Sequence, residues 1–68
     1  MKIKELRKRA GLTQQELADK ALVTRSQISR YENGKRYPDL PNLIRIKCAI
    51  GCTLDELVGP SSEDGTIQ

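Results

Sequence analysis

The chain of 68 residues contains no histidine, tryptophan or phenylalanine and only two tyrosines. Histidine is the commonest general acid or base in enzymes. The sequence also offers no nucleophile elbow, no phosphate-cradling glycine loop and no converging carboxylates. We therefore expect no enzymatic activity and no cofactor. The scarcity of aromatic rings also argues against sites that stack sugars or unpaired bases.

Cysteines and long apolar runs are equally scarce. The two cysteines, Cys48 and Cys52, fall short of a four-ligand zinc site because no histidine can complete it, so no metal site is expected. In a reducing cytosol both thiols should stay reduced. No window approaches the roughly 18 apolar residues of a membrane span, and no apolar stretch follows the basic start as in a signal peptide. These absences indicate a cytoplasmic protein without membrane contact.

The hydrophobic residues of the chain are mainly aliphatic, and its charged residues are unevenly distributed along the sequence. Hydrophobic residues make up 37% of the sequence, enough for one small domain. Residues 1–36 hold ten Lys or Arg and four Asp or Glu, a balance of +6, whereas residues 37–68 hold two against five, a balance of −3. The asymmetry suggests a polyanion-binding surface in the N-terminal half, with a merely solvated basic surface as the alternative.

Capping signals predict where the helices begin. Thr13, Thr24 and Thr53 each precede a Glu or Gln by three residues, the spacing of a capping box in which the Thr hydroxyl and the returning side chain each satisfy a backbone amide. Asp39 is the expected N-cap of a further helix, with Pro41 in its first turn. Ile3, Leu6 and Ala10 form an apolar stripe on a helix that Gly11 should end.

These signals predict an all-α fold of five helices. The helices are expected at about Lys2 to Ala10, Thr13 to Ala21, after Thr24, Asp39 to Gly51, and Thr53 to about Val58. We expect residues 1–59 to form one domain, and the polar residues 60–68 to form a flexible tail.

The helix after Thr24 has an unusual outer surface. With Ile28 pointing inward and a rotation of about 100° per residue, Tyr31 and Glu32 lie beside Ile28. The residues expected to point outward, or to flank that outward side, are polar or basic: Arg25, Ser26, Gln27, Ser29, Arg30 and Asn33. Since the helix's only acid is on the inward side, its outer surface is free to meet an anion.

Only about three residues separate this helix from the one before it, so the two helices should cross steeply as in a helix-turn-helix. The segments T-Q-Q-E-L-A, V-T-R-S-Q-I-S-R-Y-E-N-G-K, P-D-L-P-N-L-I and G-C-T-L-D-E-L together resemble the phage repressor and Cro-type (XRE-type) helix-turn-helix DNA-binding family. The resemblance covers about residues 3 to 58. It implies a compact five-helix, lambda-repressor-like DNA-binding domain.

The resemblance also implies roles for individual residues. The family's base-reading positions fall on Arg25, Ser26 and Arg30, with Gln27 and Ser29 as neighbours able to join them. Either arginine could instead hold a phosphate. The positions implied to contact the DNA backbone are Gln14, Asn33, Lys35 and Arg36.

Other exposed polar residues are less specific. Gln14 is also expected to brace the helix after Thr24, the recognition helix of the resemblance, and its alternative interpretation is an exposed polar residue at a helix start. For Lys4, Lys8 and Arg9 we favour a solvated surface. Tyr37 could pack on the fourth helix or donate to a phosphate.

Arg7 and Glu32 lie at the edges of their helices' apolar faces, and we expect them to form a structural ion pair. Members of the family have such a pair between the first and third helices. Two positions depart from the family pattern. Leu22 stands in the turn where many members have Gly, and Lys47 stands where a small buried Ala is usual, so its ammonium must reach solvent or an acid.

The sequence therefore favours a sequence-specific transcriptional regulator of double-stranded DNA, a repressor that binds a palindromic operator as a dimer. The expected dimer contact uses Leu54, Leu57 and Val58. The alternative is a helix-turn-helix module whose main partner is a protein, as in an antitoxin or an antirepressor partner.

Overall fold

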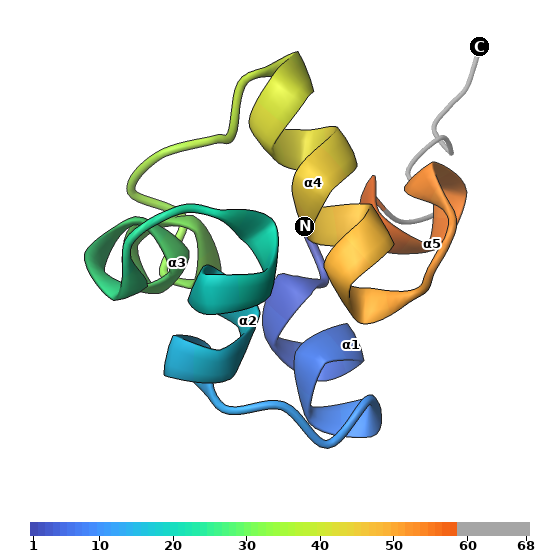
Figure 1. Cartoon of the computed structure of the whole chain (residues 1–68). Coiled ribbons are helices and arrows are strands. Elements are labelled where there is room, and N and C mark those ends of the chain that lie inside the picture. The colour runs from blue at the N-terminus through green and yellow to red at the C-terminus, as the bar shows by residue number, and fades with distance from the viewer. Residues whose placement is uncertain (59–68) are drawn as a thin grey trace, which may run out of the picture.

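A computed structural model describes residues 1–58 of the chain, and the predicted tail with its boundary at residue 59 lies outside them. The described part is all helical, as predicted: α1 (Ile3–Arg9), α2 (Gln14–Ala21), α3 (Arg25–Glu32), α4 (Leu40–Ile50) and α5 (Leu54–Val58). In Figure 1, α2 lies at the centre of the bundle, with α3 on one side and α4 on the other. None of the described helices is long and apolar enough to cross a membrane.

All three capping boxes are confirmed by their hydrogen bonds. Thr13 Oγ1 accepts from the Glu16 amide at 3.0 Å, and the Thr13 amide donates to Glu16 Oε1 at 2.8 Å. The same reciprocal pair joins Thr24 to Gln27 at the start of α3 and Thr53 to Glu56 at the start of α5. These side chains satisfy amides that the first helical turn leaves without a partner, which is why the sequence determines the starts so well.

The turn between α2 and α3 is formed by a residue in the left-handed conformation. Leu22 has φ 59° and ψ 41°, and its amide donates to the carbonyls of Ala18 and Asp19 that end α2. Its side chain is 77% exposed. The turn therefore carries the steric cost expected for a non-glycine residue at positive φ, with little burial of the side chain in return.

The core draws one or more aliphatic side chains from every helix. The largest fully buried side chains are Ile3, Leu17, Ile28, Ile46 and Leu57. The amide of Lys2 donates to the carbonyl of Leu57 at 2.8 Å, which joins the start of α1 to α5. Because α5 closes the core in this way, residues from the two ends of the described chain pack in one cluster.

Two predictions about apolar side chains are wrong. Ala10 was expected in the inward stripe of α1, but it is the exposed C-cap, and the inward position after Leu6 belongs to the buried Arg7. Leu57 was expected to contribute to a dimer surface, but it is fully buried in the core of its own chain. Lys47 is half-buried, and among residues 1–58 it forms no salt bridge, so the alternative in which its ammonium meets an acid is not seen.

Candidate nucleic-acid interface

The outward side of α3 and the residues after it enclose a shallow hollow of about 390 Å³. Three of its lining side chains are cationic and three are small and polar: Arg25, Ser26, Ser29, Arg30, Asn33 and Lys35. We call this surface the α3 hollow. It unites four of the five residues predicted to read bases with two of the four predicted to hold phosphates.

The fifth predicted base reader, Gln27, has a different environment. Its Oε1 accepts from the Thr24 amide at 2.9 Å and lies 3.3 Å from Thr24 Oγ1. The side chain does not line the α3 hollow. Since the capping box occupies its oxygen, Gln27 has only its amide nitrogen to offer outward.

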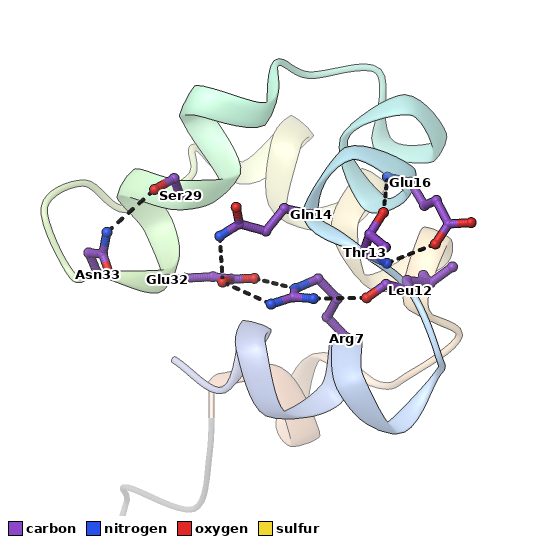
Figure 2. Close-up of polar contacts among 8 residues, drawn as sticks. All are labelled: Arg7, Leu12, Thr13, Gln14, Glu16, Ser29, Glu32 and Asn33. Atoms are coloured by element: carbon purple, nitrogen blue, oxygen red, sulfur yellow. Dashed lines mark hydrogen bonds and ion pairs between the residues drawn. The ribbon is translucent and has the colours of Figure 1, made fainter.

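Ser29 and Asn33 are joined by a hydrogen bond that sequence reasoning missed. Asn33 Nδ2 donates to Ser29 Oγ at 3.4 Å, from one turn of α3 to the next, as Figure 2 shows. The i, i+4 spacing of a serine and an asparagine was the available signal. The bond leaves Arg25, Ser26 and Arg30 as the lining residues of α3 whose side chains have no protein partner within residues 1–58.

The inward end of α3 is held by the predicted ion pair. Arg7 Nε donates to Glu32 Oε2 at 2.6 Å, and Arg7 Nη2 donates to Glu32 Oε1 at 3.3 Å. The side chains are 10% and 3% exposed, respectively. Arg7 Nη1 also donates to the carbonyl of Leu12 at 2.8 Å, so the guanidinium fixes the α1 to α2 connection as well as the end of α3.

Gln14 joins the same network from the first turn of α2. Its Nε2 donates to Glu32 Oε1 at 3.0 Å (Figure 2). The predicted bracing of the recognition helix is thus confirmed, while a phosphate contact by Gln14 stays a prediction. The carboxylate of Glu32 accepts from one guanidinium and one amide, and its charge is neutralised beneath the basic surface of α3.

The segment after α3 places further cations beside the hollow. The amides of Lys35 and Arg36 both donate to the carbonyl of Arg30, at 2.9 and 3.4 Å, around Gly34 at φ +73°. Tyr37 is 72% exposed, so it does not pack on α4 and its hydroxyl is free for solvent or a phosphate. Within residues 1–58, none of the cations of this surface pairs with an acid: Arg25, Arg30, Lys35 and Arg36.

The basic residues of α1 are placed differently. Lys4 and Lys8 are exposed, and Arg9 Nη2 lies 3.1 Å from Glu56 Oε2 of α5. They line no part of the α3 hollow. Their exposure fits the solvated surface that we favoured for them.

Two capping glutamates have shifted acidities. The Thr13 amide lowers the pKa of Glu16, and the Thr53 amide, assisted by Arg9, lowers the pKa of Glu56, because each donor favours the charged carboxylate. Burial raises the pKa of Cys52, and the nearby charge of Glu56 adds to the rise. Neither cysteine is in a disulfide, and Cys48 is exposed.

Comparison with known proteins identifies a family and several related chains. Residues 3–57 match a family model described as helix-turn-helix. The chain is 40% identical over 57 residues to the HTH-type transcriptional activator BcrR of Enterococcus faecalis, which covers 84% of this chain and 28% of that protein. It is 39% identical over 66 residues to the uncharacterized HTH-type transcriptional regulator YqaE of Bacillus subtilis strain 168. This match covers 97% of this chain and 57% of that protein.

A phage protein is also similar. The cryptic phage CTXphi transcriptional repressor RstR of Vibrio cholerae is 35% identical over 68 residues, covering 94% of this chain and 61% of that protein. The chain therefore spans less than two thirds of the length of each of these three relatives. No solved structure matches the chain significantly.

Proposed function

Since the chain belongs to the helix-turn-helix family, we propose that it is a transcriptional regulator that binds double-stranded DNA in a sequence-specific manner through α3. The observation that carries this proposal is the α3 hollow with its neighbouring cations, none of which pairs with an acid in the described part of the chain. Unpaired arginines and lysines on one side of a domain attract the phosphate backbone, and released counterions then favour binding.

Two groups of polar residues would make different contacts with DNA. Arg25, Ser26 and Arg30, with Ser29 and the amide nitrogen of Gln27, would meet base edges in the major groove. A second group would hold the phosphates and set the register of α3: Gln14, Asn33, Lys35 and Arg36. Contacts of this second kind strengthen binding without selecting a sequence.

The finer proposal is a repressor that binds a palindromic operator as a homodimer. A domain of this size reads about half a site, and two-fold helix-turn-helix dimers bind half-sites roughly one helical turn apart. Leu57 cannot contribute to the dimer contact because it is buried, which leaves Leu54 and Val58 of the original expectation. Binding at a promoter would then exclude the polymerase.

A second candidate function rests on apolar side chains of α4. Leu40 and Ile44, one turn apart, are 64% and 43% exposed. Such a pair could contact a protein partner, as in the interaction-module alternative, and this function can coexist with DNA binding.

The test is equilibrium binding to duplex DNA over a series of salt concentrations. We expect affinity to fall steeply with salt and to fall further in Arg30→Ala. Lys8→Ala, which removes one exposed charge from α1, is the matched control and should bind nearly as wild type. Binding that depends neither on salt nor on Arg30 would exclude the DNA proposal and favour the interaction module.

A further inference from the structure

We propose that the α3 hollow selects guanine, so that each half-site carries two guanines recognised by Arg25 and Arg30 about two base steps apart. The inference rests on the proposed DNA-binding function and goes beyond it by naming the bases. It follows from the kinds of hydrogen-bonding groups that line the hollow and from those that are missing.

The hollow is lined mainly by hydrogen-bond donors. Arg25, Arg30 and Lys35 carry side chains that donate and never accept. Ser26 can do either, and the Ser29 hydroxyl, which accepts from Asn33, keeps its own proton to donate. No carboxylate and no apolar side chain is among the lining residues.

Each base presents a different pattern to such a surface in the major groove. Guanine offers two acceptors, N7 and O6, which match the two parallel N–H groups of an arginine. Cytosine offers a donor and calls for a carboxylate, and thymine offers a methyl group that calls for an apolar contact. The lining supplies neither a carboxylate nor an apolar side chain, so neither cytosine nor thymine would be recognised directly by the hollow.

Adenine would need a side-chain amide, which reads its N6 and N7 together. Gln27 is the amide on the first turn of α3, but the cap holds its oxygen. Asn33 is one turn beyond Ser29 and donates to it, at the far end of the helix. Guanine is therefore the base edge that the free groups of the hollow fit best.

The separation of the two arginines sets the spacing of the guanines. Arg25 and Arg30 are five residues apart, or about 7.5 Å along the axis at a rise of about 1.5 Å per residue. Successive base pairs are about 3.4 Å apart. A helix lying along the groove would thus bring the two guanidinium groups to base pairs about two steps apart, on one strand or on both.

The experiment begins with selection of bound duplexes from a random pool by the full chain. We expect the recovered half-site to contain two G·C pairs separated by about two steps. Replacing each guanine by 7-deazaguanine, which lacks the N7 acceptor, should then weaken binding at these positions and not at flanking guanines. Exchange of either G·C pair for A·T should weaken binding by about 5- to 150-fold, the range of one bidentate contact.

Arg25→Ala and Arg30→Ala are the decisive variants because each removes the donors to one guanine, whereas a lysine would still donate to its N7 and O6. Each should lose the preference at one guanine and keep it at the other. A selected half-site of A·T pairs at both positions, or alanine variants with unchanged preferences, would overturn guanine reading while DNA binding stands. Absence of any enrichment or salt dependence would instead overturn the proposed function itself.

Discussion

Gln14 Nε2 and Arg7 Nη2 donate to one and the same oxygen of Glu32, at 3.0 and 3.3 Å. The first turn of α2, the last turn of α1 and the last turn of α3 therefore meet at a single carboxylate. Because that carboxylate is nearly inaccessible to solvent, its charge depends on these donors for compensation. This contact, together with the burial of Ile28 and Tyr31, holds α3 in its orientation in the domain.

We expect Glu32→Ala to lower the free energy of unfolding by about 3 to 5 kcal/mol, because it leaves the Arg7 guanidinium buried without its acid. Urea denaturation followed by circular dichroism measures the loss. Glu32→Gln keeps one acceptor oxygen and should lose less. Arg9→Ala breaks the exposed pair with Glu56 and should change stability little, because water and salt screen such a pair. Equal losses in Glu32→Ala and Arg9→Ala would contradict the structural role of the buried pair.

Leu22→Gly should stabilise the domain by about 0.5 to 1 kcal/mol. Glycine removes the strain of the left-handed conformation, about 1 to 2 kcal/mol. Its greater conformational freedom in the unfolded chain lowers stability by about 0.4 to 1 kcal/mol. The exposed leucine side chain has little burial to lose. Thermal unfolding of the variant should therefore occur at a higher temperature than that of wild type.

Gly51→Ala is the opposite control. Gly51 has φ +84°, and a Cβ added there would meet no atom within 4 Å, so the substitution adds no steric contact and acts through backbone strain and the freedom of the unfolded chain. We expect it to destabilise the domain by about 1 kcal/mol. If both variants shifted the melting temperature in the same direction, the account of the two left-handed positions would be wrong.

Acid should destabilise the protein through the two capping glutamates. Their pKa values are lowered in the folded state, so their stabilising contribution is fully present above the ordinary glutamate pKa and is lost as pH falls through the lower folded values. We expect the melting temperature to decline below about pH 4.3. The double variant Glu16→Gln and Glu56→Gln should decline less steeply, because an amide oxygen caps without titrating, as Gln27 does at α3. An identical decline in both proteins would assign the acid sensitivity to other groups.

Arg36→Ala should weaken binding to all duplexes by a similar factor and lower the slope of log affinity against log salt by about one. The residue is exposed and outside the α3 hollow, so the melting temperature should not change. Fluorescence anisotropy at several salt concentrations measures the slope. A change in sequence preference would instead place Arg36 among the residues that contact bases.

The helix starts could be predicted from the sequence because each depends on a few residues at fixed spacing. A capping box is complete within four residues, and its geometry does not wait for the rest of the fold. Arg7 and Glu32 were identifiable because a charged residue at the edge of an apolar face needs a partner, and the family resemblance supplied the pairing.

Burial of the short helix α5 was harder to predict. The five residues of α5 are too few for a periodic pattern to show which side is covered, and the fate of Leu57 depends on the docking of α5 against α1. Ala10 was misassigned because the helix ends one residue earlier than its stripe suggests. The division of the polar side chains of α3 into engaged and free groups likewise required their positions in space.

The two ends of α3 are fastened by side chains that do not line the α3 hollow, Thr24 with Gln27 at the start and Glu32 at the end. The side chains at positions 25, 26 and 30 take no part in that fastening. They can therefore be exchanged without redesign of the scaffold, and a library randomised at these three positions should consist mostly of folded members. New target preferences can therefore arise by substitution of a few exposed residues of α3, while the other residues of the domain maintain its stability.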